Sequence, residues 1–273
     1  MIKGMTGFGH TQIVVRKIKI LIEIKSVNHR YLDVNYFLPA GFGSFESDIR
    51  QILQRELNRG RVTVSIKVLQ KDFAQAVFNK DVAKKHLKNI SQLKKEFGIQ
   101  GTLSLSDMVK LPGVLEVTEA VVSPEMLGPL LEKSFRKALH GVVQMRIREG
   151  RSLATDISGQ LRRMQAQVKK IKAQSKSVLS EKKKILNAEE FRSFQRGSDV
   201  NEEITRLLHY IDEIKPLLKT DTAVGKKIDF VAQEMQRETN TIGAKLQDKI
   251  VSNAVIALKS KIEKIREQAQ NVE

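Results

Sequence analysis

The chain has 273 residues, of which 48 are Lys or Arg and 31 are Asp or Glu, so its formal charge is +17. Its 41% apolar share is typical of globular proteins and excludes wholesale disorder, while the length favours two domains over three or more. The lack of Cys excludes disulfides, thiolate nucleophiles, iron–sulfur clusters and thiolate zinc sites.

The first seventy residues show the patterns of a strand-rich unit. Apolar residues alternate with other residues in three segments, 17–27, 31–38 and 62–68, which is the side-chain period of a strand with one buried face. Leu21 lies between the alternating isoleucines of the first segment and indicates that the second face is partly covered. Between the last two strands, apolar residues three or four apart predict a helix over residues 44–58, and Gly60 follows as a stop signal.

After residue 81 the apolar period becomes helical. A short amphipathic helix is predicted to end at Gly98, a loop over residues 101–123 contains Pro112-Gly113, and Pro124 opens a new helical pattern. Residues 153–179 form the clearest helix, since their apolar residues follow the alternating four- and three-residue spacing of a coiled-coil seam. The seam positions are Ile157, Leu161, Met164, Val168, Ile171, Ser175 and Val178.

The last third of the chain is predicted to be helical throughout. Residues 197–201 are the expected break, a helix from Glu202 ends before Pro216, and another begins near Ala223 and runs towards the C-terminus with a shift of its apolar face near Val251. These elements make an α+β protein. We expect an N-terminal α/β oligomerisation domain over residues 1–155, a long basic connecting helix over residues 156–196, and a C-terminal helical domain over residues 197–273.

The positive charge points to a polyanionic partner, with nucleic acid as the first candidate and anionic membrane as the second. Residues 160–196 carry eleven Lys or Arg and three Asp or Glu, a local charge of +8. A basic cytosolic protein without a dedicated site is the alternative. No apolar run reaches the roughly 18–20 residues of a membrane helix, and residues 1–10 lack the apolar centre of a signal peptide, so we expect a cytoplasmic protein.

Three polar clusters could carry chemistry. Glu234 and Glu238 lie one helical turn apart beside the buried stripe of their helix, so they could hold a divalent cation whose other ligands are water and phosphate oxygens. The same spacing is also routine on a solvated helix. His29 and Arg30 lie where the first two strands meet, and imidazole beside guanidinium can act on a phosphate, although a polar hairpin turn has the same composition.

The third cluster holds three arginines, which suit phosphate contacts, although a solvated helix face would look the same. They are Arg146, Arg148 and Arg151. Glu149 and Asp156 lie seven residues apart in this segment and would share a face if the helix continues through Gly150.

Seven sequence segments resemble the YicC/YloC family of bacterial stress-associated endoribonucleases, over essentially the whole chain. They are KGMTGFG near the N-terminus, EIKSVNHRYLD from Glu23, RGRV from Arg59, LPGV from Leu111, MRIREGRSLATD from Met145, and VGKKIDFVAQEMQRETNTIGAK with IEKIREQAQNVE at the end. Two positions depart from the family pattern. His209-Tyr210 stands where the family has a Ser-His pair, and Gln236 stands where Asn is common.

The resemblance implies cleavage of single-stranded or stem-loop RNA, assisted by a divalent cation (Mg or Mn), in a basic channel of a ring-like homo-oligomer, expected to be a hexamer. It implies no membrane and no small-molecule cofactor. The implied catalytic residues are Glu234, Glu238, His29 and Lys245. The implied metal ligands are Glu234, Glu238, Glu203 and Asp248. The implied RNA contacts are Arg30, Arg146, Arg148, Arg151, Arg206 and Arg237.

Two mechanisms and two further functions remain open at this point. A cation could activate water, with Arg237 and Lys245 stabilising charge on the phosphate, or the RNA 2′-OH could attack with His29 as base and without metal. A non-catalytic RNA-binding or scaffolding oligomer would leave RNA intact. A basic coiled coil on a membrane surface is disfavoured, because the positive face lacks aromatic anchors.

Overall fold

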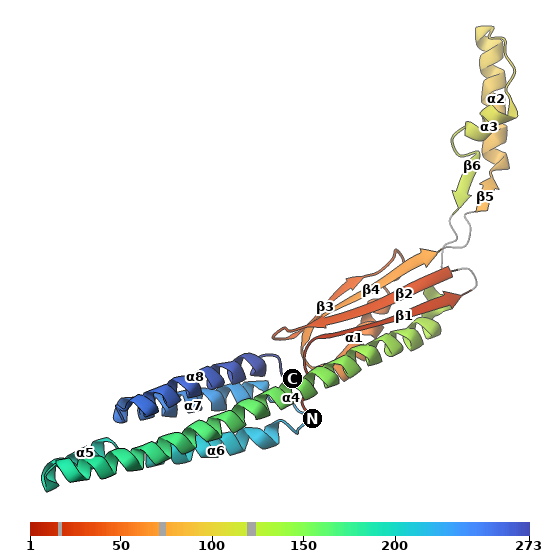
Figure 1. Cartoon of the computed structure of the whole chain (residues 1–273). Coiled ribbons are helices and arrows are strands. Elements are labelled where there is room, and N and C mark those ends of the chain that lie inside the picture. The colour runs from red at the N-terminus through yellow and green to blue at the C-terminus, as the bar shows by residue number, and fades with distance from the viewer. Residues whose placement is uncertain (16–17, 71–74, 119–123) are drawn as a thin grey trace.

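The computed structural model describes residues 1–15, 18–70, 75–118 and 124–273. The predicted α+β class is confirmed, since a four-stranded sheet occupies the N-terminal part and long helices follow it (Figure 1). Within the described ranges, no helix is both long and apolar enough to cross a membrane.

The sheet has the strand order β1-β2-β4-β3. Strands β1 (Gly7–Val15), β2 (Ile18–Val27) and β4 (Gly60–Gln70) are antiparallel neighbours, whereas β3 (Leu32–Phe37) runs parallel to β4. Helix α1 (Phe45–Glu56) links the parallel pair. The three predicted strands and the predicted helix are confirmed, while β1 is an addition.

The sheet core lies between its inner face and two helices. Helix α1 and the first half of α4 (Pro124–Ile185) cover this face, where the inward isoleucines of β2 are fully buried. Strand β1 comes closest to α4, because a Cβ on Gly9 would lie 2.0 Å from the Ala138 carbonyl oxygen. Glycine on the inner face of β1 therefore allows the sheet and the helix to approach each other closely.

A separate arm is inserted between β4 and α4. It consists of β5 (Gln75–Phe78), α2 (Lys80–Phe97), α3 (Leu105–Lys110) and β6 (Leu115–Thr118), with β5 and β6 paired antiparallel. Figure 1 shows the arm extending away from the sheet. Helix α2 ends, as predicted, at a left-handed Gly98 with φ of 66°. The loop prediction for residues 101–123 is wrong over α3 and β6, and residues 119–123 lie outside the described ranges.

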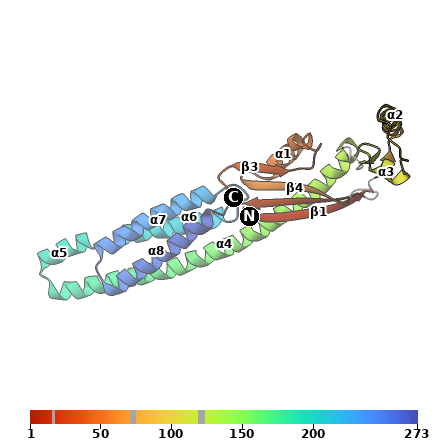
Figure 2. The same ribbon diagram turned by 90° about the horizontal axis from the view of Figure 1, so that it is seen from above.

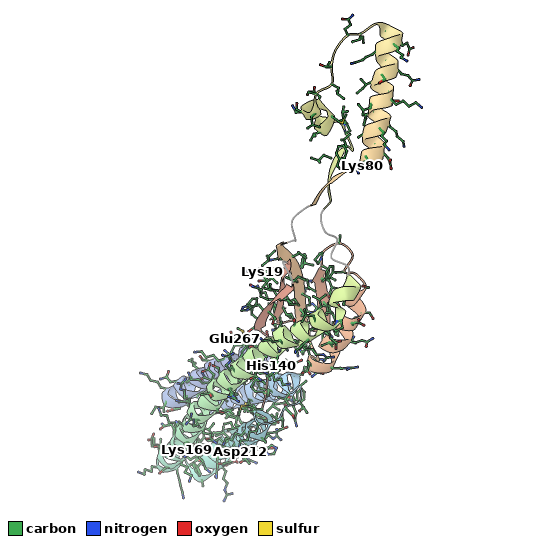
Figure 3. All side chains as sticks on the ribbon, turned by 90° about the vertical axis from the view of Figure 1, so that its right-hand side faces the viewer. Lys19, Lys80, His140, Lys169, Asp212 and Glu267 are labelled. Atoms are coloured by element: carbon green, nitrogen blue, oxygen red, sulfur yellow. The ribbon has the colours of Figure 1, made fainter. Side chains whose placement is uncertain are left out.

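Four helices form an elongated bundle: α4, α6 (Asn201–Leu217), α7 (Gly225–Lys245) and α8 (Lys249–Ala269). Helix α4 has 62 residues, a length of about 93 Å at 1.5 Å per residue, and it runs from the sheet into the bundle (Figure 2). Its predicted seam is confirmed, since Ile157, Leu161, Met164 and Ile171 are fully buried. The opposite surface of α4 is basic, with Lys169 exposed, and in Figure 3 Lys169 and Asp212 mark the bundle end of the molecule.

Two of the predicted helices are each divided in the structure. Helix α5 (Ala188–Gly197) is separate from α4 because Asn187 caps it, accepting hydrogen bonds from the main-chain N–H groups of Glu189 and Glu190. The last predicted helix is divided because Asp248 caps α8, close to the place where the apolar face shifts. The expected boundary between the N-terminal domain and the connecting helix, at residues 155 and 156, lies inside α4, which continues through it without a break.

Both chain ends lie beside the middle of α4, where the sheet meets the bundle (Figures 1 and 2). Gly4 and Val272 form an antiparallel bridge, and the main chains of Lys3 and Glu273 are hydrogen bonded, with a distance of 2.9 Å from Glu273 N to Lys3 O. The first and last residues therefore join the two halves of the molecule.

Candidate functional site

The segment around Met145 binds the N-terminal segment of the chain. The Glu149 carboxylate accepts hydrogen bonds from the main-chain N–H of Thr6, at 2.9 Å, and from its hydroxyl, at 2.5 Å. Gly150 lies directly against the main chain of Ile2, since a Cβ there would be 2.0 Å from the Ile2 oxygen. Glu149 and Gly150 therefore act in this structure by fixing the N-terminal segment on α4.

Arg146 is fully buried at the junction of the two chain ends. Its guanidinium donates to the Gly4 carbonyl at 2.8 Å, to the Arg59 carbonyl at 3.2 Å, and to the Glu273 carboxylate at 2.5 Å. The same carboxylate accepts from the main-chain N–H groups of Asn58 and Arg59, both at 2.9 Å. Burial lowers the pKa of Arg146, whereas Glu273 raises it.

This environment corrects the expectation that Arg146 contacts RNA. A guanidinium without exposed surface cannot reach a phosphate in this arrangement, so we leave Arg146 out of the RNA-binding set. Arg148 and Arg151 occupy the same helix with exposed side chains, and they remain candidates.

The acidic cluster lies between α6 and α7. Arg206 on α6 donates to the Glu238 carboxylate on α7 at 3.1 Å and also pairs with Glu202. Lys245 on α7 donates to the Glu203 carboxylate on α6 at 2.6 Å and to the Asp199 carbonyl at 3.1 Å. Two ion pairs therefore cross from one helix to the other.

The acids of these two pairs are buried, whereas the bases are more exposed. The Glu203 and Glu238 residues are 6% and 5% exposed, against 53% for the Arg206 side chain and 35% for that of Lys245. The hydrogen bond to Glu238 raises the pKa of Arg206, and the one to Glu203 raises the pKa of Lys245. Among the described residues, one oxygen of Glu203, Oε2, is buried and has no hydrogen-bond partner. Buried carboxylates held by exposed cations differ from an ordinary solvated helix face.

The remaining predicted metal ligands are dispersed. Glu234 is half-buried one turn before Glu238, on the same helix. Both oxygens of Asp248 are occupied elsewhere, one by the first turn of α8 and the other by Gln174 of α4 at 3.2 Å. In the part of the chain that the structure describes, no three acidic or histidine side chains gather closely enough to hold a metal ion.

His29 lies in the sheet domain and not between α6 and α7. Its Nδ1 lies 3.0 Å from the Tyr31 carbonyl oxygen and its Nε2 lies 3.3 Å from Nη2 of Arg61, which in turn pairs with Asp33 at 2.9 Å. These contacts are all within the sheet domain, so the structure does not bring His29 into the α6–α7 cluster.

The positions that depart from the family pattern lie near that cluster. His209 is exposed on α6, while Tyr210 is half-buried against the bundle core, and their ring centroids are 6.0 Å apart. Gln236 and Arg237 are on α7 beside the acids, with Arg237 exposed. Sequence reasoning missed Arg59, whose main chain is held by Glu273, because its partner is 214 residues away.

Comparisons with known proteins cover the whole chain. Two family models match it, that of the endoribonuclease YicC-like N-terminal region over residues 2–155 and that of the endoribonuclease YicC-like C-terminal region over residues 156–273. A protein of Clostridioides difficile (strain 630) named probable endoribonuclease YicC is 32% identical, over 99% of each chain. A protein of the same name from Haemophilus influenzae (strain ATCC 51907 / DSM 11121 / KW20 / Rd) is 30% identical, over 100% of each chain.

Proposed function

We propose, since the chain belongs to the family of YicC-like endoribonucleases, that it cleaves phosphodiester bonds within single-stranded or stem-loop RNA. The observation that carries the proposal is the α6–α7 cluster, in which two buried carboxylates, Glu203 and Glu238, are each bound by a base of the neighbouring helix. Such pairs hold charged groups in a defined geometry, as a reaction on a charged phosphate requires.

The bases of the cluster have exposed surface, so they can meet a phosphate while they hold the acids in place. Arg206 and Lys245 each contact their acids through the ends of flexible side chains, and Arg237 is exposed nearby on α7. Arginine donates two parallel hydrogen bonds to phosphate oxygens, and lysine adds a point charge. We assign Arg206 and Arg237 to the RNA backbone and Lys245 to the developing charge on the phosphate.

A divalent cation, Mg or Mn, fits this cluster in part. Mg²⁺ is often held by one or two carboxylates, with water and phosphate oxygens as its other ligands, so three converging acids are not required. Glu234 and Glu238 supply a pair one turn apart, and Oε2 of Glu203 is an acceptor without a partner in the part of the chain that the structure describes. Asp248 does not fit, because hydrogen bonds engage both of its oxygens. A cation bound there would neutralise charge on the phosphate.

The metal-independent route uses another part of the molecule. His29 has Arg61 at 3.3 Å, which supplies imidazole next to guanidinium, and Arg30 follows it with an exposed side chain. In this route the RNA 2′-OH attacks the phosphorus and His29 accepts its proton, while the bond from phosphorus to the 5′ oxygen of the next nucleotide breaks. The products are a 2′,3′-cyclic phosphate and a 5′-OH, whose proton comes from water. Water attack assisted by a cation leaves a 3′-OH, so the RNA ends distinguish the two routes.

The test is incubation of the purified chain with a labelled stem-loop RNA, with and without EDTA, followed by end-group analysis. We expect cleavage to stop in EDTA, and we expect Glu234→Gln with Glu238→Gln to lower the rate by at least about a hundredfold. The matched control is Glu263→Gln with Glu267→Gln, an exposed pair with the same spacing on α8. Undiminished cleavage in EDTA would remove the cation from the proposal.

A non-catalytic RNA-binding or scaffolding oligomer is the second candidate. The observation that favours it is that Glu203 and Glu238 are already neutralised by Lys245 and Arg206, as in a purely structural ion-pair network. Under this function the wild-type chain binds RNA without cutting it, and the double Gln variant binds equally well.

We also propose assembly into a ring-like homohexamer with a basic channel. The arm supports association, because it leaves several large apolar side chains exposed in a single chain. They are Leu87, Leu93, Phe97, Ile99 and Leu105. Light scattering coupled to size-exclusion chromatography tests this, since a hexamer has about six times the 30.9 kDa mass of one chain and a monomer would contradict it.

A further inference from the structure

A pocket of about 270 Å³ lies where the sheet domain meets the bundle. Its walls come from the segment after β2, the turn before β4, the start of α7 and the end of α8. Its volume is just below the roughly 300 Å³ at which small-molecule sites begin, which suits a small group better than a large ligand. The polar residues that line it include Asn28, Arg30, Arg59, Lys226, Asp229 and Gln270.

The charge of this junction pocket is positive. Arg30, Arg59 and Lys226 contribute three cations, and Asp229 is the one acid among the lining residues. The Asp229 carboxylate is already engaged, because Arg266 donates to one oxygen at 3.1 Å and Gln233 donates to the other at 2.8 Å. The three cations therefore face the pocket without an equal number of free anions, and a concave positive surface attracts an anion.

Arg59 lines the junction pocket and has a fixed main chain. Its main chain is fixed on both sides, by Glu273 at the N–H and by Arg146 at the carbonyl. A fixed main chain reduces the freedom that this cation loses when it binds an anion at the pocket.

The N-terminus of α7 adds to the positive electrostatic potential of the junction pocket. Its first turn contains no acidic residue, and the preceding Val224 makes no side-chain cap, so the first N–H groups of the helix are not satisfied by a capping carboxylate. Lys226 belongs to this turn. These groups reinforce the cations of the junction pocket but would not define a site without them.

We infer that the junction pocket binds a phosphate group of RNA, at a place separate from the α6–α7 acids. The inference deepens the proposed function, because it takes RNA as the substrate. Asp229 at the pocket and Glu238 in the cluster are nine residues apart on α7, a separation of about 13 Å along the helix axis. The pocket therefore positions the strand, and the reaction occurs at another phosphate.

The experiment measures binding of a short single-stranded 2′-O-methyl RNA in EDTA, a probe and a medium that prevent both routes of cleavage. The probe is labelled at its 3′ end and followed by fluorescence anisotropy with the full chain. We expect Lys226→Met and Arg30→Met each to weaken binding by about tenfold, the effect of one lost charge-assisted contact. Both side chains are exposed, so the variants should fold.

Lys227→Met is the matched control. Lys227 is the next residue, pairs with Glu213 at 3.3 Å, and does not line the junction pocket, yet its loss changes the net charge by the same amount. We expect less than a twofold change for this control. If Lys226→Met and Lys227→Met weaken RNA binding equally, the loss of affinity comes from the change in net charge, and the pocket is not a phosphate site.

Two further arms identify the source of the phosphate. Millimolar inorganic phosphate should displace the probe from the wild type and have less effect on Lys226→Met. A preference for RNA with a 5′-phosphate over RNA with a 5′-hydroxyl would assign the pocket to the strand end, and equal binding would assign it to an internal phosphodiester. Absence of competition by phosphate in the wild type would overturn the inference. Because these arms measure binding alone, a failure here is distinct from a failure to cleave.

Discussion

The ion pair between Arg146 and Glu273 offers the sharpest test of how the two halves of the molecule are joined. Its atoms are 2.5 Å apart, and the two side chains are 0% and 4% exposed. Replacing Arg146 by Met removes three hydrogen bonds from the guanidinium and leaves a buried carboxylate whose remaining donors are two main-chain N–H groups. Removing one partner of a buried pair costs about 3–5 kcal/mol.

That cost is a large share of the stability of a protein, which is about 5–15 kcal/mol in total. If the free energy of unfolding falls by about 3 kcal/mol per M of urea, the loss of the ion pair lowers the midpoint of urea unfolding by about 1–1.7 M. Arg148→Met is the control, because Arg148 is exposed on the same helix and its loss should change stability by less than about 0.5 kcal/mol.

The assay is urea unfolding followed by far-UV circular dichroism, at one fixed protein concentration because subunit association would also change stability. A shift below about 0.3 M for Arg146→Met would refute the reasoning. RNA affinity measured in buffer without urea provides a second readout. If Arg146→Met remains folded yet weakens RNA binding at least as much as Arg148→Met does, the buried role assigned to Arg146 is wrong.

Three further predictions concern packing, a helix cap and pH. Gly150→Ala should destabilise the chain by about 1–3 kcal/mol in urea unfolding because its Cβ meets main chain, whereas Gly159→Ala on the same helix has open space and should stabilise slightly. Asp248→Ala should lower the free energy of unfolding by about 0.5–2 kcal/mol, because it removes the N-cap of α8, whereas Asp248→Asn should keep the cap and the stability. A changed Mg²⁺ requirement for RNA cleavage in Asp248→Asn would instead indicate that Asp248 is a metal ligand. The hydrogen bond to Glu203 raises the pKa of Lys245, so from neutral pH upwards this pair contributes stability up to the ordinary lysine value and loses it as pH rises through the raised pKa. A loss of the Lys245→Met effect on urea unfolding between pH 7 and 9 would contradict this.

The separation between the acidic cluster and the junction pocket has a functional consequence. Helix α7 carries residues of both, with Lys226 at its start and Glu238 two-thirds of the way along it. A single rigid helix can therefore fix the distance between the place where we propose that a strand is held and the place where we propose that it is cut. Variants at the pocket should then alter RNA affinity more than the rate of cleavage at saturating RNA.

Local patterns predicted the buried faces well, because alternation of period two and spacing of three or four residues depend only on which side chains a strand or helix buries. The isoleucines of β2 and the seam of α4 are buried as expected. The same patterns failed to predict β1, because glycine occupies two of its inward positions, Gly7 and Gly9, and the strand therefore shows no apolar alternation there. Only the close approach of α4 shows why glycine is required there.

The amino-acid sequence by itself determined the α+β class, the long seam of α4 and the one-turn spacing of Glu234 and Glu238 on α7, because these follow from neighbours along the chain. Tertiary structure alone decided which charges meet. Lys245 finds Glu203 across 42 residues and Arg146 finds Glu273 across 127, and no local pattern distinguishes these residues from exposed ones. Burial depends on what packs against a side chain from elsewhere in the fold, so the same arginine composition yields a solvent-facing Arg148 and a fully enclosed Arg146 two residues apart.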